Sequence, residues 1–198
     1  MSEPGFTYSP QILRETAEGI NRFDIRDEML SHRELELTTP VDAESCATII
    51  RGLLYLQRCD AGAPVTLYIN SPGGEVQSGL ALYDVMQAVS CPIRTVCLGM
   101  AASMAALLFI AGDERQMLPH SRVMIHDPLI GAGVGGSALS VKARVDDLMR
   151  IRDVTAEVIA RHSGMSLERV FELTAQDTYF EASEAVEAGL ADAVVTSL

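Results

Sequence analysis

Two spacings of apolar residues alternate along this chain, and their alternation predicts its architecture. Short apolar runs typical of strands are followed by stretches in which apolar residues recur every three or four positions, as in amphipathic helices. Strands are predicted at residues 33–38, 65–69, 93–98, 122–125 and 194–195. Helices are predicted at residues 42–57, around 82–89, from about 103, and at 139–162, 166–173 and 183–188. Strands that alternate with helices indicate an α/β domain with a largely parallel sheet.

Single residues mark several of these boundaries. Asp42 is a suitable N-cap for the helix that follows it, because its carboxylate can accept from the first backbone N–H groups. Gly189 suits the C′ position after the helix at 183–188. Gly99 is expected to break the strand at 93–98. The pattern of residues 11–31 is mixed and charged, and it predicts no element there.

Length and composition fit one folded domain. The chain has 198 residues, of which 48% are hydrophobic and 21% charged, as in ordinary globular proteins. Residues 1–10 are rich in Pro, Gly and Ser and are expected to form a flexible N-terminal extension, with a single domain over 11–198. The glycine tract at 131–136 is predicted to be flexible or extended.

The charge balance narrows the classes of partner. A formal net charge of −12 disfavours binding to nucleic acid or to anionic membranes, because both repel an acidic surface. The first ten residues have neither the basic nor the apolar region of a signal peptide. The longest mostly apolar stretch, 98–112, is too short to span a bilayer. We therefore expect a cytoplasmic protein.

The four cysteines carry no metal-binding or disulfide signature. They do not form a Cys-x-x-Cys pair, and no histidines stand beside them at metal-ligand spacing. We expect them to be buried free thiols in a reducing compartment, with a secreted disulfide protein as the alternative. They are Cys46, Cys59, Cys91 and Cys97.

Ser103 is the first candidate for chemistry. It follows an apolar strand and opens a helix of very small residues, so backbone N–H groups and the positive helix end are directed towards its hydroxyl. This placement is similar to a nucleophile elbow, although the Gly-x-Ser-x-Gly spelling is absent. The alternative interpretation is a plain N-cap serine.

His126 is the second candidate. It lies at the C-terminal end of an apolar strand, where parallel-sheet proteins place their sites. A neutral imidazole there could serve as general base toward a serine. A purely structural histidine is the alternative.

The third candidate is the loop at 70–74, Asn-Ser-Pro-Gly-Gly. Its two glycines can expose backbone N–H groups, which suits an oxyanion hole, a phosphate cradle or only a tight turn. Nucleotide binding is not indicated, because the chain has neither a Walker sequence nor a Gly-x-Gly-x-x-Gly that opens a helix.

The order and spacing of these segments carry a family resemblance. YINSPGG, then GMAASMAA, then SRVMIHDPL resembles the ClpP family of self-compartmentalising serine peptidases, from about Pro10 to the C-terminus. The ending, Glu184-Ala185-Val186 followed by Gly189-Leu190, is similar to that of the family. The resemblance implies a ClpP/crotonase-like spiral of ββα units, with a handle helix and strand at about 127–162.

The resemblance also implies roles for individual residues. Ser103 would be the nucleophile, His126 the general base, and Asp177 the third triad member, because the family places an Asp some fifty residues after the histidine. The N–H groups of Gly74 and Met104 would form the oxyanion hole. A segment starting near 129 would bind the substrate as an added strand. The implied substrate-binding residues are Gly73, Pro128, Leu129, Ile130 and Gly131.

The resemblance further implies partners. Two stacked heptameric rings would enclose the sites, and an AAA+ unfoldase would deliver unfolded polypeptides, so ATP is used by the partner and no cofactor or metal by this chain. Gln176 stands where the family usually has Arg, and Thr66 and Ala88 where aromatics are common. Two alternatives to an active serine peptidase stay open. One, suggested by these departures, is a weakly active ring subunit that supports a second ClpP-type paralogue. The other is a crotonase-type CoA enzyme, which shares the spiral fold but has no serine triad.

Overall fold

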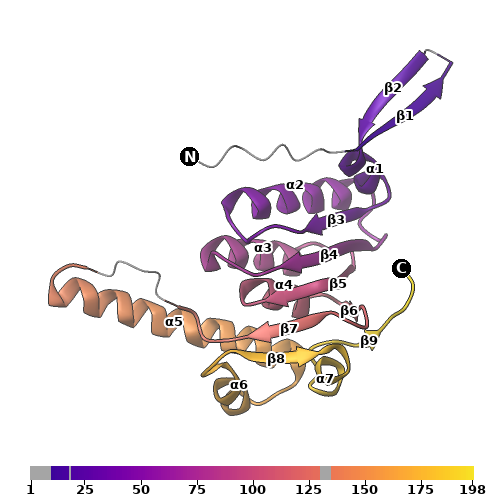
Figure 1. Ribbon diagram of the computed structural model, residues 1–198. Helices are drawn as coiled ribbons and strands as arrows, with labels where there is room; N and C mark the ends of the chain where they lie inside the picture. Colours follow the sequence, from indigo (N-terminus) through magenta and orange to yellow (C-terminus); the bar gives the residue numbers. More distant parts are fainter. Residues whose placement is uncertain (1–9, 18, 130–134) are drawn as a thin grey trace, which may run out of the picture.

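The predicted alternation of strands and helices builds one parallel-rich sheet. The structure is a computed structural model that describes residues 10–17, 19–129 and 135–198. Five strands lie side by side in parallel (Figure 1). In spatial order they are β3 (Glu34–Leu37), β4 (Val65–Ser71), β5 (Ile93–Ala102), β6 (Glu114–Met117) and β9 (Ala193–Val194).

Two further strands extend the sheet at the far end of β5. Strand β7 (Arg122–Ile125) runs parallel to residues 100–102 of β5, and β8 (Thr178–Glu181) runs antiparallel to β7. The first part of β5, residues 94–97, pairs instead with β6. Along one edge, strand β5 therefore pairs first with β6 and then with β7.

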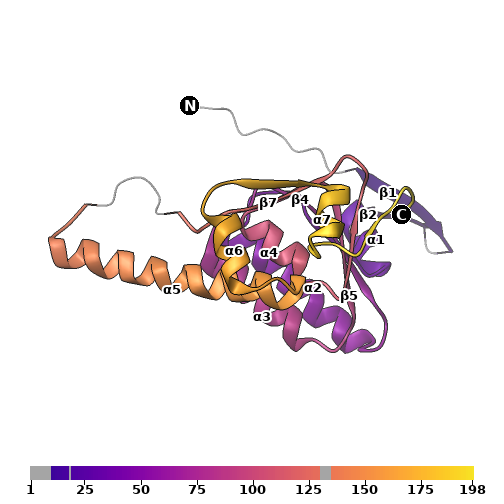
Figure 2. The same ribbon diagram turned by 90° about the horizontal axis from the view of Figure 1, so that it is seen from below.

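Helices cover one face of this sheet (Figure 2), and they follow one another in space as in sequence (Figure 1). They are α2 (Ala43–Cys59), α3 (Val76–Ala88), α4 (Met104–Ile110) and α5 (Ala138–Ser163). Helices α6 (Leu167–Thr174) and α7 (Ala182–Glu187) close the C-terminal end beside β8. The mixed α/β architecture with a mostly parallel sheet confirms the predicted fold class.

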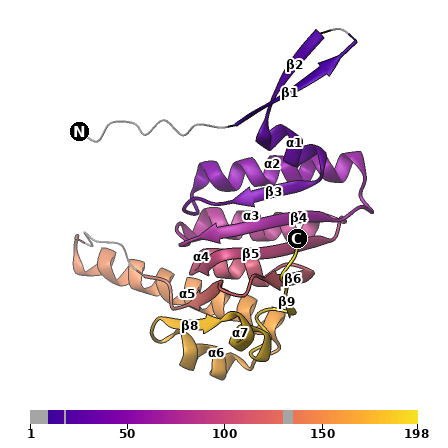
Figure 3. The same cartoon turned by 45° about the vertical axis from the view of Figure 1, so that its right-hand side comes forward.

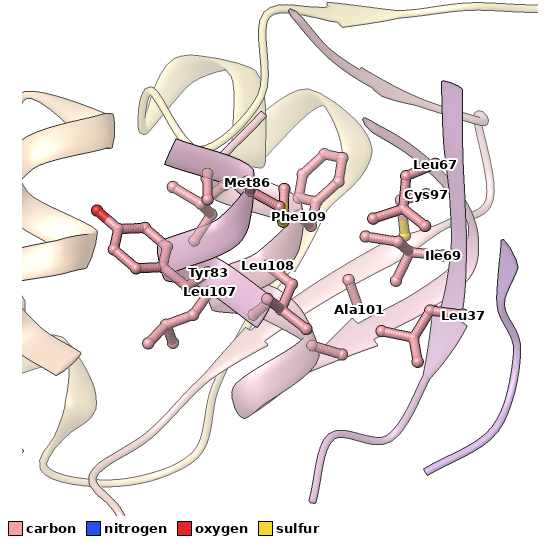
Figure 4. Packing of buried hydrophobic residues seen from close by; sticks show 14 of the residues in the cluster. Leu37, Leu67, Ile69, Tyr83, Met86, Cys97, Ala101, Leu107, Leu108 and Phe109 are labelled. Carbon is pink, nitrogen blue, oxygen red and sulfur yellow. The ribbon is translucent and has the colours of Figure 1, made fainter. Parts of the chain in front are cut away.

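The core lies between the sheet and these helices. Strand β4 shows why: Val65, Leu67 and Ile69 are fully buried, while the alternate residues Thr66 and Tyr68 are only half-buried. This is the period-2 alternation of a sheet with one covered face. Helix α4 is buried along its whole length, and its Phe109 and Leu108 meet the sheet residues inside the core (Figure 4).

The predicted helix boundaries are largely confirmed. Asp42 caps α2, accepting from the Ser45 N–H while the Ser45 hydroxyl accepts from the Asp42 N–H. Gly189 follows α7 with a φ of 73°, a left-handed conformation that glycine adopts without strain. Helix α5 agrees with its prediction at 139–162 to within one residue at each end.

The predicted break at Gly99 is wrong. Strand β5 continues through it to Ala102, and Met100 donates its N–H to the side-chain oxygen of Asn70 at 3.1 Å. A Cβ at position 99 would lie 2.7 Å from that same oxygen. Glycine therefore makes room for Asn70 rather than ending the strand.

The N-terminal part holds elements that the pattern does not predict. Strands β1 (Gln11–Thr16) and β2 (Gly19–Asp24) form an antiparallel hairpin that projects from the body, and α1 (Ile25–Ser31) joins it to β3 (Figures 1 and 3). Leu13 and Ile20 on this hairpin are exposed, so it has no buried face to give a strand signal. Nearly all of the predicted extension at 1–10 lies outside the described residues.

Helix α5 is covered at one end only. Its buried residues, Thr155, Ala156, Val158 and Ile159, lie in its C-terminal half, and the remainder extends away from the body (Figure 1). The glycine tract predicted at 131–136 lies mostly outside the described residues.

The thiols are free, as predicted, but not all are buried. Cys46, Cys91 and Cys97 are buried, whereas Cys59 at the end of α2 is exposed, which corrects the expectation for that residue. Cys59 lies on the last turn of α2, beyond the part of the helix that packs on the sheet. Within the described ranges, no helix combines the length and apolarity needed to cross a membrane.

Candidate active site

Strand register brings three of the predicted site residues together. In the antiparallel pair β7–β8, Ile125 lies opposite Thr178, so the next pair outward is His126 opposite Asp177. In the parallel pair β5–β7, Ala102 lies opposite Met124, which places Ser103 just beyond the end of β5 and level with the last residue of β7. The sheet therefore presents the three side chains at one edge.

Ser103 sits on a sharp turn between β5 and α4. Its φ of 55° and ψ of −124° lie in a region that residues with a Cβ rarely adopt. The turn is held by the Ser103 N–H, which donates to the Met124 carbonyl at 2.8 Å. Ser103 occupies the N-cap position of α4, but its hydroxyl makes no capping hydrogen bond to that helix.

His126 contacts both partners at once. Its Nε2 lies 2.8 Å from the Ser103 hydroxyl, and its Nδ1 lies 3.0 Å from an Asp177 carboxylate oxygen. An ionised carboxylate can only accept, so Nδ1 carries the proton and donates to Asp177. Nε2 is then left with a lone pair that accepts from the Ser103 hydroxyl.

The His126 and Asp177 side chains differ in their exposure to solvent. The His126 side chain is 14% exposed and the Asp177 side chain 58%. Asp177 lies in the short connection between α6 and β8, where Thr178 donates its hydroxyl to the Leu173 carbonyl at 2.6 Å. Solvent therefore reaches the carboxylate end of the arrangement, while the imidazole is largely shielded.

The glycine loop after β4 lies directly beside Ser103. A Cβ at Gly73 would lie 2.7 Å from Ser103 Cβ and 3.0 Å from the Met104 nitrogen, so only glycine fits there. Gly74 forms a parallel bridge with Val41, in which Gly73 and Glu75 supply the hydrogen bonds. The N–H of Gly74 consequently faces the other side of the loop, as alternate groups of an extended chain do.

Met104 is the first residue of α4, and the first N–H groups of a helix have no partner within it. Its side chain is buried against α3 at Gly79, where an added Cβ would lie 2.2 Å from Met104 Cγ. The missing side chain at Gly79 thus lets Met104 anchor the start of α4. Gly73 therefore lies against Ser103 and the start of α4, and Gly74 is the next residue along the loop.

The predicted substrate-binding segment is described only in part. Pro128 is half-buried and Leu129 is 75% exposed, just past the end of β7. Ile130 and Gly131 lie outside the described residues. Leu129 is a large apolar side chain open to solvent, three residues after His126 in the chain.

Sequence reasoning missed a group of polar residues behind His126. Asp127 accepts from Arg152 of α5 at 2.6 Å and from the Thr174 hydroxyl at 2.6 Å. The Arg152 guanidinium also lies over the Phe171 ring, 4.1 Å from its centroid. Asp127 stands beside His126 in the sequence, but nothing in the local pattern indicates that residues 25 and 47 positions away converge on it.

Other parts of the molecule offer less to this chemistry. No cluster of three or more metal-ligating side chains occurs among the residues that the structure describes. A groove of about 640 Å³ runs between α1, β3 and α2, but its lining contains none of the site residues named above.

Comparison with known proteins identifies the family of this chain. The Clp protease family model matches residues 16–198. The ATP-dependent Clp protease proteolytic subunit of Bacteroides fragilis is 39% identical over 196 residues, which cover 98% of this chain and 93% of that protein. Both likenesses extend over nearly the whole chain, including every strand end described above. The chain belongs to the Clp protease family, and it is a protease of that family.

Proposed function

We propose that this chain is a serine endopeptidase in which Ser103 is the nucleophile, His126 the general base and Asp177 the residue that orients the base. The observation that carries the proposal is the pair of distances at His126, 2.8 Å to Ser103 and 3.0 Å to Asp177. A nucleophile within hydrogen-bond reach of a base, itself held by a carboxylate, is the arrangement that activates a serine.

The reaction is acyl transfer in two steps. His126 Nε2 takes the Ser103 proton as Oγ attacks the peptide carbonyl, and the resulting imidazolium returns that proton to the leaving amine. Water then attacks the acyl-enzyme with the same histidine as base, releasing the carboxylic acid and restoring Ser103. Asp177 keeps the proton on Nδ1 and stabilises the imidazolium during both steps.

The tetrahedral intermediate needs donors for its negative oxygen. The N–H groups of Gly74 and Met104 are the proposed oxyanion hole, since Gly74 directly follows Gly73, which lies against Ser103, and Met104 directly follows Ser103 at the start of α4. Their hydrogen bonds strengthen as charge develops on the oxygen, which is why such donors lower the barrier. Gly73, Pro128 and Leu129, with Ile130 and Gly131 of the adjoining segment, are proposed to bind the substrate chain.

The family membership supports a larger assembly. We propose that the chain associates into two stacked heptameric rings and acts on unfolded polypeptides delivered by an AAA+ unfoldase, which consumes the ATP. The Bacteroides fragilis relative is named an ATP-dependent proteolytic subunit, which supports an energy-dependent partner. The exposed apolar residues along the free part of α5, such as Leu139 and Met149, suit contact with further subunits. We place the activity in the cytoplasm, and the chain itself uses no cofactor.

The alternatives find less support. A weakly active subunit would suit a displaced base or carboxylate, but the three side chains already lie within hydrogen-bond distance. A crotonase-type CoA enzyme would not need Ser103 to be reactive. Serine reactivity is therefore the property that separates these proposals.

The test uses a fluorophosphonate probe and a fluorogenic peptide on the purified full chain. We expect covalent labelling at Ser103, found by peptide mass spectrometry, and peptide hydrolysis that Ser103→Ala abolishes. Ser78→Ala, at a half-buried serine of α3 whose hydroxyl donates to the Glu75 carboxylate at 2.6 Å, is the matched control and should keep both signals. Hydrolysis that survives Ser103→Ala would refute the assignment of the nucleophile. Native mass spectrometry tests the assembly separately, and a subunit number other than fourteen would contradict the two stacked heptameric rings.

A further inference from the structure

We propose that Asp127 is a positioning residue, which together with Arg152 and Thr174 holds His126 and Asp177 in contact. The proposal rests on the proposed function of those two residues. Asp127 follows the base directly, and both oxygens of its carboxylate are engaged by residues from other elements. It makes no contact with Ser103 and has no role in the reaction steps given above.

Asp127 is bonded to the end of α6 twice. Its N–H donates to the Thr174 carbonyl at 2.7 Å, and its carboxylate accepts from the Thr174 hydroxyl at 2.6 Å. Thr174 is buried, at 3% exposed, so these bonds are shielded from water. The backbone beside the base is thereby tied to the residue that begins the connection leading to Asp177.

That connection is short and otherwise weakly held. Only residues 175–177 lie between Thr174 and the start of β8, and all three are exposed. Thr178 fixes the far end through its pairing with Ile125 and its hydroxyl bond to Leu173. Asp127 fixes the near end. With both ends held, the carboxylate of Asp177 has few positions available, and one of them is 3.0 Å from His126.

Arg152 links this contact to α5. Its Nε donates to Asp127 at 2.6 Å, and its guanidinium stacks on Phe171 of α6 at 4.1 Å. Both charged side chains are less than one-third exposed, which makes the ion pair less screened than a surface pair. The orientation of α5 is thus transmitted to Asp127, and through Thr174 to the Asp177 connection.

The experiment compares two substitutions of Thr174, one that removes its hydroxyl and one that keeps it. Thr174→Val removes the hydroxyl at nearly constant shape, whereas Thr174→Ser keeps it. We expect Thr174→Val and Asp127→Ala to lower kcat and the rate of Ser103 labelling by a fluorophosphonate about tenfold or more, the order of loss that misplaced catalytic groups produce. KM should change little, and Thr174→Ser should restore most of the rate.

A control on the same helix tests whether any lost ion pair has this effect. Arg150→Gln removes the exposed pair with Asp147, two positions from Arg152, and should leave the labelling rate unchanged. Circular dichroism identifies any variant that fails to fold. If Asp127→Ala does so, the Thr174→Val and Thr174→Ser pair decides the question.

A cycle with Asp177→Asn separates positioning from general loosening of the structure. If Asp127 acts through Asp177, then Asp127→Ala should cost little more once Asp177 is already Asn. An equal loss in both backgrounds, or wild-type labelling rates in Asp127→Ala and Thr174→Val, would overturn the proposal. Failure of the wild-type chain to label at Ser103 would instead overturn the proposed function.

Discussion

The Ser103 N–H donates to the Met124 carbonyl at 2.8 Å, so the proposed nucleophile is hydrogen-bonded to the strand that carries the proposed base. Met124 lies two residues before His126, and His126 faces Asp177 across the next strand pair. One backbone hydrogen-bond ladder through β5, β7 and β8 therefore sets all three positions. Rotation of the three side chains is then enough to bring them within hydrogen-bond distance.

Removal of individual members of the proposed triad should have unequal effects. Ser103→Ala and His126→Ala should each lower kcat by about 10⁶, because triad members act as a unit in serine proteases. Asp177→Asn should lower kcat by about 10⁴, because the amide favours the wrong imidazole tautomer. Steady-state hydrolysis of a fluorogenic peptide measures both. Asp146→Asn, an exposed carboxylate on α5, serves as control and should keep wild-type rates.

The backbone at Ser103 should make glycine more stabilising there than alanine. A φ of 55° strains any residue with a Cβ, and relieving it is worth about 1–3 kcal/mol. Ser103→Gly should therefore have a higher Tm than Ser103→Ala, although we expect both variants to be inactive. Thermal unfolding followed by circular dichroism compares them. A lower Tm for the glycine variant, as glycine usually causes elsewhere, would show that the turn is not strained.

Acid should destabilise the fold through His162. Burial lowers the pKa of His162 below its ordinary value of 6.5, and the nearby Arg115 and Arg161 add to the effect. The unfolded chain thus takes up the proton more readily than the folded one. The contribution of His162 to stability is complete above pH 6.5 and is lost as the pH falls through that value toward the lower folded pKa.

The measurement for this prediction is the free energy of unfolding in urea between about pH 8 and pH 5, the span in which histidine titrates. His162→Gln removes the titrating group and can still meet the Tyr83 hydroxyl, which lies 3.1 Å from Nε2 in the wild type. Its stability should fall less on acidification than that of the wild type. Parallel pH curves for the two proteins would contradict the prediction.

The cysteines should differ in reactivity, and reduction should leave assembly unchanged. Cys59 is exposed and should react with a maleimide in the folded protein. Burial raises the pKa of the Cys97 thiol to about 11, so it should react only on unfolding. Mass spectrometry of labelled peptides distinguishes the two sites. Native mass spectra with and without reductant should give the same subunit number, and dissociation on reduction would contradict this.

The order of elements was predictable because strong local patterns coincide with burial. Strand β4 alternates buried and half-buried residues, and α2 carries an apolar stripe behind a good N-cap, so both are legible in sequence. Hairpin β1–β2 has an exposed surface on nearly every residue and therefore gives no such pattern. Gly99 was misread because a glycine that makes room for Asn70 has the same local signature as one that ends a strand.

The site divides in the same way. Ser103 and His126 follow apolar strands, a position that sequence can indicate. Asp177 depended on the family resemblance, because its meeting with His126 arises from strand pairing between segments 51 residues apart. The contacts of Asp127 arise likewise from tertiary packing, which no local spacing reports.

The uncovered part of helix α5 affects the secondary structure of the chain when the protein is dilute. Its 26 residues would extend about 39 Å, yet its buried residues begin only at Thr155. Arg152 is held by Asp127, but the residues before it, 138–151, include no buried side chain and rely mainly on helix propensity, which is marginal in water for so short a segment. Apolar residues such as Val145 are exposed there and gain from being covered. We therefore expect the helix content, measured as far-UV ellipticity, to increase with protein concentration as the chains associate.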